Sequence, residues 1–390
     1  MEKKLKVLMM GFTGRIGLTY HLARIALGLK QQGLDVVVFT TDKEQVKGLK
    51  RELNEKGIKY YEGNFLDKKT KLGVYCRAIR EISAIIKDED IDIVQSHGFL
   101  IPVYLASRPP FAGRKVLVVD MVHSFWHRTK SETFLCRVQT ILMNLCPDIS
   151  LPVSEQLRQE LIAFGVKPEK LTVVHWGIDL EKFDRDKSSD KYLSKYQASL
   201  DKLGEKTVVQ SGMLYPLGRK GQEYLLKAVP AILQAFPDTK FLIVGDGPLR
   251  GQLEELVREL GIGQSVIFTG EVEGDFIPRI LGYADVGVVV SLLETFCIAL
   301  IELMASGKPV VSTPVGVAPE IVTPENDIGF IVPLRDPDAL TQAIIKLLAA
   351  PAMAREMGSR GRKLVETSFT MNVMAGNLKR IYESVTNISS

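Results

Sequence analysis

The feature that most constrains the fold of this chain is an alternation of short apolar runs with helix-length stretches, which occurs twice. The first series of expected strands is Lys6–Met10, Val36–Thr40, Asp92–Ser96, Val116–Val122, Ile149–Val153 and Leu171–Val174. The second series is Thr207–Gln210, Lys240–Val244, Ser265–Thr269, Val286–Val290, Val310–Ser312 and Gly329–Val332. Such alternation is typical of parallel sheets built from strand–helix–strand units. We therefore predict an α/β chain with two Rossmann-like, doubly wound parallel-sheet domains.

The boundary between the two domains is expected in a polar stretch. Residues 184–206 are rich in charged side chains and serine and lack an apolar period. A chain of 390 residues is also too long for one ordinary domain. We expect a first domain over residues 1–185 and a second over 206–367, with a last helix in 368–390. Ligands of such sheets bind at the carboxyl ends of the strands, which predicts a cleft between two facing domains.

Composition limits the class of protein. No run of about 18 apolar residues is present, so the sequence predicts no membrane-spanning helix. The first residues enter an apolar run too short for the core of a signal peptide. The four cysteines show no Cys-x-x-Cys spacing, which favours reduced thiols; they are Cys76, Cys136, Cys146 and Cys297. We expect a cytoplasmic protein.

The charge is distributed unevenly. The net charge is +4, but basic residues exceed acidic ones only in residues 1–180. Two basic stretches, 43–59 and 68–80, leave two interpretations open. They either place the first domain against an anionic membrane, as a peripheral protein on its inner face, or are ordinary solvated helices. Nothing in the pattern points to a nucleic-acid partner.

Three glycines follow the first expected strand at three-residue spacing, Gly11, Gly14 and Gly17. Glycines before a helix let a phosphate approach backbone N–H groups and the positive end of the helix dipole. A tight strand–helix turn without a ligand is the alternative. A dehydrogenase loop is a further one, but such enzymes need a Tyr-x-x-x-Lys pair, and the sequence contains none. We predict that Gly14 and Gly17 contribute to binding a nucleotide donor.

Two acidic residues in the second half mark a candidate site. Glu294 follows the expected strand Val286–Val290, and Glu302 lies within a stretch of helix-forming composition. Amides at the start of this helix, around Phe296, Cys297 and Ile298, would be available for a phosphate or sugar oxygen. A carboxylate accepts two hydrogen bonds at once, which suits the vicinal hydroxyls of a sugar or ribose. By themselves, the two acids could equally be surface residues.

Five segments, in this order and spacing, resemble the donor domain of retaining glycosyltransferase family 4 (glycosyl transferases group 1), which has the GT-B fold. They are Phe241–Leu249, Val266–Val272, Glu294–Glu302, Met304–Val311 and Pro319–Val322. The resemblance implies that Glu294 contacts the transferred sugar and that Glu302 binds the nucleotide ribose. It also brings Gly245 and residues 296–298 to the donor, and implies that the last helix crosses back to the first domain.

A basic pair that neutralises the diphosphate is a further family feature. Members usually have Gly-Arg-Leu followed by Lys-Gly, whereas Met213 stands at the arginine position here. The resemblance assigns Lys220 to the diphosphate, with Arg219 in place of the missing arginine. In the first half, the similarity of Val119–Ser124 to a family strand end places His123 near the reacting sugar. The predicted catalytic residues are therefore Glu294 and His123.

The resemblance implies a retaining glycosyltransferase that moves a hexose from a nucleotide-diphosphate sugar to a hydroxyl acceptor. UDP is expected as the nucleotide because it is frequent in the family. We expect no cofactor and no metal, because no Asp-x-Asp motif lies near the site. A glycan or lipid-linked acceptor is expected, as in glycan, lipopolysaccharide or glycolipid synthesis. Two alternatives stay open, a sugar-nucleotide epimerase on the same fold and an inactive nucleotide-binding homologue.

Overall fold

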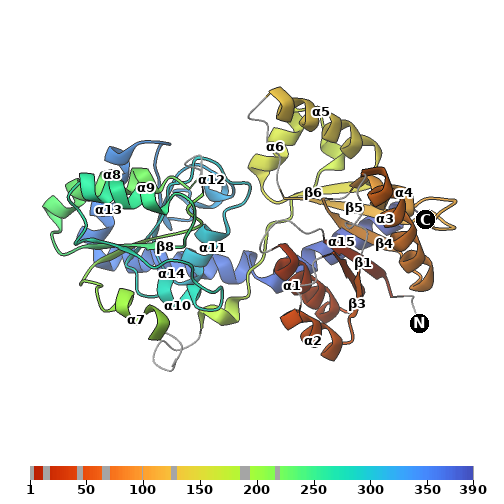
Figure 1. Cartoon of the computed structure of the whole chain (residues 1–390), viewed down its shortest axis with the longest axis horizontal. Coiled ribbons are helices and arrows are strands. Elements are labelled where there is room, and N and C mark those ends of the chain that lie inside the picture. Colours follow the sequence, from red (N-terminus) through yellow and green to blue (C-terminus); the bar gives the residue numbers. More distant parts are fainter. Residues whose placement is uncertain are drawn as a thin grey trace. The chain divides into compact units, whose positions relative to one another are not determined.

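The computed structural model describes residues 4–11, 18–41, 47–63, 71–98, 100–123, 130–184, 194–215 and 220–389. The chain forms two compact units, one of Met1–Gly177 with Met371–Ser390 and one of Ile178–Thr370 (Figure 1). The chain thus passes between the units at residues 177–178 and again at 370–371. Part of the predicted linker, Ser194–Leu200, is a helix (α7) of the second unit.

The first unit contains a six-stranded parallel sheet of order β3-β2-β1-β4-β5-β6. Its strands are β1 (Lys6–Gly11), β2 (Asp35–Thr40), β3 (Lys59–Glu62), β4 (Ile93–His97), β5 (Leu117–Val122) and β6 (Ile149–Pro152). The predicted strand Leu171–Val174 is wrong, since only Leu171 bridges to Ser150 of β6. The edge strand β3 was not predicted, because its side chains are half-buried or exposed and form no apolar run.

Helices cover both faces of this sheet: α1 (Leu18–Gln31), α2 (Lys47–Glu55), α3 (Lys71–Asp88), α4 (Leu100–Ala106), α5 (Lys130–Leu145), α6 (Glu155–Ala163) and α15 (Met371–Ser389). One core joins strand residues such as Leu8 and Val94 to Ile82 of α3 and Val103 of α4. On the other side, α15 packs against α1. The last helix therefore completes the first unit although it follows the second unit in the sequence.

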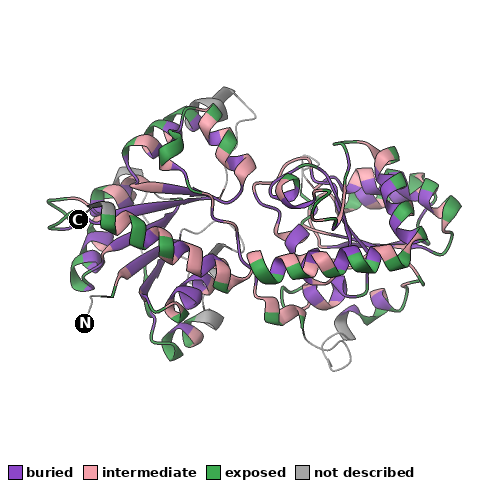
Figure 2. Ribbon diagram, turned by 180° about the vertical axis from the view of Figure 1, so that it is seen from behind, coloured by how far each residue is buried: buried purple, intermediate pink, exposed green. Residues whose placement is uncertain are grey.

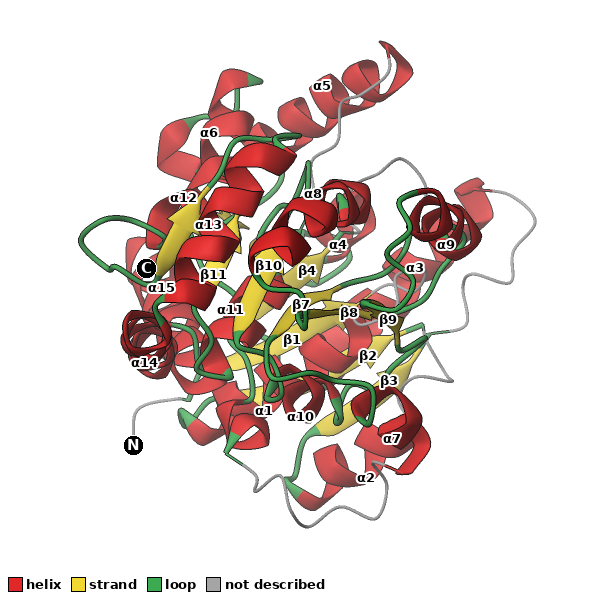
Figure 3. Ribbon diagram, turned by 90° about the vertical axis from the view of Figure 1, so that its left-hand side faces the viewer, coloured by secondary structure: helices red, strands yellow, loops and turns green. Residues whose placement is uncertain are grey.

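The second unit has its own six-stranded parallel sheet, of order β12-β11-β10-β7-β8-β9. The strands are β7 (Thr207–Ser211), β8 (Lys240–Val244), β9 (Val266–Phe268), β10 (Val286–Val289), β11 (Val310–Ser312) and β12 (Gly329–Ile331). In Figure 3, β10, β7, β8 and β9 lie side by side in this order. Two parallel sheets of this kind confirm the predicted fold class.

The helices of the second unit bury the sheet on both sides. Besides α7 they are α8 (Gln222–Ala235), α9 (Arg250–Glu259), α10 (Ile277–Leu281), α11 (Ile298–Ala305), α12 (Ala318–Ile321), α13 (Pro337–Ala349) and α14 (Pro351–Ser368). The core combines Val208 and Phe241 of the sheet with Leu225 of α8 and Ile344 of α13. The strands β10 and β11 are buried along their whole length, whereas the edge strand β12 is half-buried to exposed (Figure 2). Within the described ranges, no helix is long and apolar enough to cross a membrane.

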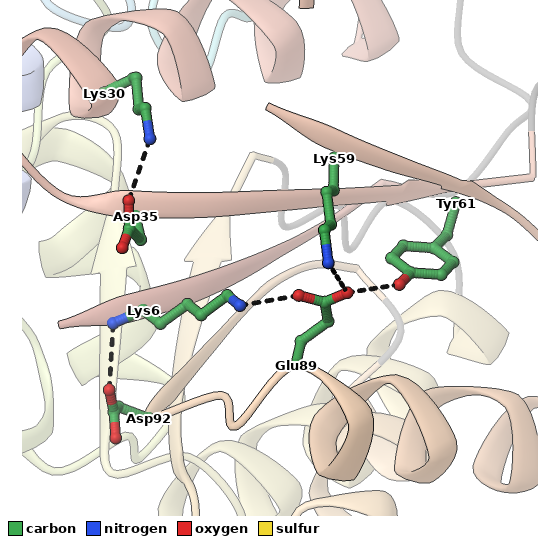
Figure 4. Close-up of polar contacts among 7 residues, drawn as sticks. All are labelled: Lys6, Lys30, Asp35, Lys59, Tyr61, Glu89 and Asp92. Carbon is green, nitrogen blue, oxygen red and sulfur yellow. Dashed lines mark hydrogen bonds and ion pairs between the residues drawn. The ribbon is translucent and has the colours of Figure 1, made fainter. Parts of the chain in front are cut away.

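A buried ionic cluster joins the end of α3 to two strands of the first sheet (Figure 4). The Glu89 side chain, which is 4% exposed, accepts hydrogen bonds from Lys6 Nζ at 2.7 Å, Lys59 Nζ at 2.7 Å and Tyr61 Oη at 2.6 Å. Burial alone would raise the pKa of Glu89, but the three donors outweigh it and lower the pKa to about 2. The hydrogen bond from Tyr61 to Glu89, and to a lesser degree burial, raises the pKa of Tyr61 to about 12. The cluster thus holds a buried carboxylate that is ionised at neutral pH.

Candidate functional site

In the second unit, the candidate site lies where β7 and β10, neighbours in the sheet, end. Lys220 follows β7 and directly precedes the Gly221 that begins α8, and Glu294 lies between β10 and α11. Lys220 Nζ donates to Glu294 Oε1 at 2.7 Å, and Ser291 Oγ donates to the same oxygen at 2.8 Å. The structure therefore brings together two side chains that the sequence placed 74 residues apart.

The electrostatics of this pair keep the lysine charged. Burial alone would lower the pKa of Lys220, but the negative charge of Glu294, with a smaller contribution from Glu302, raises it. The Lys220 side chain is 29% exposed and that of Glu294 14%. A cation held at the mouth of a strand–helix loop can bind a phosphate, and a carboxylate beside it can accept hydrogen bonds from hydroxyls.

The position of Lys220 depends on the glycine that follows it. Gly221 has a φ of 66°, and a Cβ atom there would lie 1.9 Å from the carbonyl oxygen of Val290. Any other residue would therefore push this loop away from the end of β10. The carbonyl oxygen of Lys220 also accepts a hydrogen bond from Gln210 Nε2 at 2.6 Å, which ties the loop to β7. The backbone thus places the lysine against the loop of Glu294.

The start of α11 has an unusual backbone. Cys297, the residue before the helix, has φ 80° and ψ 70°, a left-handed conformation that is rare outside glycine. The first intrahelical bond runs from Leu300 N to Cys297 O, so the preceding amides, including that of Ile298, lie ahead of the hydrogen-bonded ladder. Phe296 and Cys297 are buried, and Val317 N donates to Phe296 O at 2.9 Å. Burial raises the pKa of Cys297 to about 12, so its thiol stays protonated.

Glu302 lies on α11, two residues before its buried Met304. Burial raises the pKa of Glu302 to about 7, although the positive charges of Lys220 and Lys182 oppose this shift. Its charge therefore changes close to neutral pH. Glu302 and Glu294 thus differ in environment, since Glu294 has a direct ion pair with Lys220, whereas the charges of Lys220 and Lys182 act on Glu302 at longer range.

Gly245 follows β8, and the backbone at this position requires a glycine. Its φ is 125°, and a Cβ atom would lie 2.4 Å from the carbonyl oxygen of Gly212. Its amide donates to Gly270 O at 3.1 Å. This close approach explains the glycine without a ligand, and contact of Gly245 with a donor stays a prediction.

In the first unit, the predicted His123 directly follows β5 and contacts a second histidine. His97 Nδ1 lies 2.8 Å from His123 Nε2, and the two rings stack with centroids 4.9 Å apart. On its other side, His123 stacks on Trp176 at 5.0 Å. Burial lowers the pKa of His97 to about 3, so this histidine is neutral at physiological pH. The structure thus combines two strand-end histidines that the sequence pattern presents separately.

Asp120 was not predicted as a site residue. It lies on β5, is 5% exposed, and burial raises its pKa to about 7, partly offset by a hydrogen bond from Ser96. Together with Tyr75 and Gln139 it lines a cavity of about 270 Å³. A single carboxyl in the otherwise apolar run Val116–Val122 is the sequence signal that could have identified it.

Three predicted donor residues, Gly14, Gly17 and Arg219, lie outside the described residues. Their assignments therefore stay predictions. Among the residues that the structure describes, no group of three or more His, Cys, Asp or Glu side chains is arranged to hold a metal ion.

Two sequence models of protein families match the chain and together extend over most of it. The model of glycosyltransferase family 4 matches residues 16–182, and the model of glycosyl transferases group 1 matches residues 194–364. The two matches fall largely on the first and the second unit, respectively.

Among curated proteins, a GDP-mannose-dependent monoacylated α-(1-6)-phosphatidylinositol monomannoside mannosyltransferase of Corynebacterium glutamicum is 32% identical over 241 residues. The match covers 58% of this chain and 60% of that protein. The chain spans about half to three fifths of the length of the curated relatives that it matches.

Solved structures match the chain over almost its whole length. A glycosyltransferase from Rickettsia africae superposes with a TM-score of 0.80 at 20% identity, covering 98% of this chain and 99% of the other. The Anabaena protein HepE in complex with UDP-glucose gives a TM-score of 0.77 at 20% identity, with 97% and 100% covered. At this level of identity the likeness concerns the fold.

Proposed function

Because the chain belongs to the glycosyl transferases group 1 family, glycosyltransferase family 4, with the GT-B fold, we propose that it transfers a hexose from a nucleotide-diphosphate sugar to a hydroxyl acceptor with retention of anomeric configuration. The observation that carries the proposal is the pair of Lys220 and Glu294. Their side chains lie 2.7 Å apart in the loops that follow the adjacent strands β7 and β10. A cation and a carboxylate in contact suit a ligand that carries both a diphosphate and sugar hydroxyls.

Each group has a distinct part in this reaction. Lys220 and the first amides of α11 would stabilise negative charge on the departing diphosphate. Glu294 would accept hydrogen bonds from the sugar, and Glu302 from the ribose. Donor binding would then move Lys220 from its carboxylate partner to a phosphate and free Glu294 for the sugar. The same constellation would stabilise the leaving group without a metal ion.

The metal-independent part of the proposal has a direct test. In excess EDTA, the rate of sugar transfer should stay within about twofold of the rate without chelator, because the lysine and the helix amides carry the electrostatic stabilisation. The measurement is product formation with labelled donor, with a manganese-dependent transferase as the control for chelation. Loss of transfer in EDTA that manganese restores would contradict this part.

The identity of the donor is proposed from two directions. Sequence analysis favours a UDP-sugar, and HepE was crystallised with UDP-glucose. The name of the C. glutamicum relative specifies GDP-mannose instead. A panel of UDP-hexoses and GDP-mannose, first by thermal shift and then by slow donor hydrolysis, decides between the two nucleotides. Conversion of the donor sugar without an acceptor would support the epimerase alternative.

Glu302 gives the proposed donor site a specific pH dependence. Its pKa of about 7 means that it is largely protonated at pH 6 and ionised at pH 8. Ionised, it accepts hydrogen bonds from ribose hydroxyls more strongly, so donor KM should fall roughly three- to tenfold between about pH 6 and 8. Initial rates at varied donor concentration measure this. In Glu302→Gln the donor KM should be higher and nearly independent of pH in this range. If the donor KM of the variant still fell with pH as in the native protein, the assignment of Glu302 to the ribose would be refuted.

A glycan or lipid-linked acceptor is proposed because the C. glutamicum relative is named for a phosphatidylinositol mannoside acceptor. The basic side chains that could face an anionic membrane are partly neutralised within the first unit. Lys50 pairs with Glu62 at 2.7 Å, and Arg77 with Glu81 at 2.9 Å. This pairing favours a solvated surface on α2 and α3 over a membrane-binding one.

A further inference from the structure

A chain of side-chain hydrogen bonds crosses the first unit from α15 to His123, and we propose that it holds neutral His123 in the tautomer that carries its proton on Nδ1. Tyr382, Gln95 and His97 are the members of this relay, and they act as positioning residues for His123. The inference about the tautomer concerns the donor-free protein, whereas its consequence for sugar transfer rests on the proposed function.

The contacts of the relay are continuous. Tyr382 Oη donates to Gln95 Oε1. Gln95 Nε2 lies 2.8 Å from His97 Nε2, and His97 Nδ1 lies 2.8 Å from His123 Nε2. Gln95 and His97 are two residues apart on β4, so both side chains project from the same face of the sheet. Tyr382 is on α15, and its contact with Gln95 places this helix against β4 (Figure 1).

The direction of the proton donors follows from the amide of Gln95. Its oxygen accepts from Tyr382, and its nitrogen also contacts Met121 Sδ at 3.5 Å, an atom that can only accept. An amide nitrogen has hydrogens and no lone pair to offer, so His97 Nε2 must be the acceptor. The proton of neutral His97 is then on Nδ1 and points to His123 Nε2. His123 Nε2 accepts in turn, which leaves the proton of His123 on Nδ1.

Burial keeps this direction fixed. Tyr382 and Gln95 are fully buried, and His97 is 3% exposed. Burial raises the pKa of Tyr382 and lowers that of His97 to about 3, so both stay neutral at physiological pH. A neutral imidazole has one donor and one acceptor, and the relay therefore has a single polarity. The rings of His97 and Trp176 lie nearly parallel to that of His123, at interplanar angles of 21° and 29°, and restrict the plane of its ring.

The relay determines what His123 can do in the proposed reaction. With Nε2 engaged and Nδ1 protonated, neutral His123 has no ring nitrogen left to take a proton. In the proposed reaction it therefore does not act as the general base. The opposite amide orientation of Gln95 would place both histidine protons on Nε2, so the two states are distinguishable.

Tautomers are read directly from two-bond ¹H–¹⁵N correlation spectra of the full chain labelled with ¹⁵N-histidine. The His97 and His123 signals are assigned with His97→Gln and His123→Gln. We expect both residues as the Nδ1–H tautomer, without any donor present. Two Nε2–H signals, or rapid averaging between tautomers in both rings, would overturn the proposal.

A substitution in the relay should abolish its polarity. In Gln95→Leu no side-chain donor or acceptor of residue 95 faces His97 Nε2, so His97 and His123 should each populate both tautomers. Unchanged, single Nδ1–H tautomers in a folded Gln95→Leu protein would refute the relay. Tyr382→Phe is the milder variant, because it removes one hydroxyl from the buried end. It should produce a mixture of tautomers, whereas Tyr104→Phe, a control in α4 of the same unit, should leave the spectra unchanged.

Activity separates the two levels of the inference. If His123 contacts the reacting sugars, Tyr382→Phe should lower kcat about tenfold with donor KM within about twofold, since one positioning hydrogen bond is lost. If the tautomers are as expected but Tyr382→Phe transfers sugar at the normal rate, the relay stands and the role of His123 in transfer is wrong. If the native protein shows no preference for the Nδ1–H tautomer in these two histidines, the relay itself is contradicted, whatever the activity.

Discussion

Replacing Glu294 with glutamine should lower kcat/KM for sugar transfer by about 10²–10³-fold. The substitution keeps the size of the side chain and removes the charge that pairs with Lys220 at 2.7 Å. A neutral amide cannot accept hydrogen bonds from the sugar as strongly, and it leaves Lys220 without its carboxylate partner in the donor-free protein. Initial rates with the donor selected from the nucleotide-sugar panel measure the effect.

The matched control is Glu255→Gln, on the exposed surface of α9. It removes the same charge from the same unit and should leave kcat/KM within about twofold. Lys220→Met tests the partner, and the double variant should lose less than the sum of the two losses because the side chains act as a pair. A Glu294→Gln protein that is folded, as judged by its melting curve, and transfers sugar at the normal rate would remove Glu294 from the reaction.

Replacing Glu89 with glutamine should lower the free energy of unfolding by about 3 kcal/mol. Glu89 is 4% exposed and accepts from two lysines and Tyr61, so glutamine removes the buried charge on which these donors converge, and its amide cannot satisfy all of them. Urea unfolding followed by fluorescence measures the difference. Glu55→Gln is the control, since its pair with Arg51 is exposed at 3.5 Å and should change stability by less than about 0.5 kcal/mol.

The contribution of Glu89 should also depend on pH in a defined direction. Its pKa is lowered from 4.5 to about 2, so the folded chain binds fewer protons than the unfolded chain between these values. The stabilisation is present above about pH 4.5 and is lost as the pH falls toward 2. The difference between native and Glu89→Gln proteins should therefore be smaller at pH 3 than at pH 6. A difference that is constant over this range would contradict the ionic origin of the effect.

The sequence predicts the strands that carry an apolar run and misses the edge strand β3. The run Lys240–Val244 is apolar and bounded by polar residues, and β8 has these same limits. The edge strand β3 has the pattern Lys-Tyr-Tyr-Glu, whose half-exposed side chains give no apolar signal. Leu171–Val174 carries an apolar signal, yet only one of its residues bridges to the sheet. The apolar pattern of a short segment indicates whether it is buried. Whether that segment pairs as a strand depends on neighbours that are distant in the sequence.

The same limit applies to the candidate site. The order of motifs identifies Glu294, Glu302 and Lys220, but the ion pair between the first and last of these comes from two loops brought together by adjacent strands. Gln95 and Tyr382 are 287 residues apart in the sequence. Their contact arises because α15 packs on the first unit, which residue spacing alone does not specify.

The first unit consists of two separate stretches of the chain, which affects the order in which the two units fold during synthesis. Residues 4–177 emerge from the ribosome first, yet α15, which covers α1 and supplies Tyr382, is translated only after the whole second unit. Domains generally fold in the order of their synthesis. Here the second unit is complete before the first, because the first unit still lacks α15. The second unit has all its strands and helices while the first still exposes an apolar helix face. The first unit therefore completes its core only after the second unit has been synthesised.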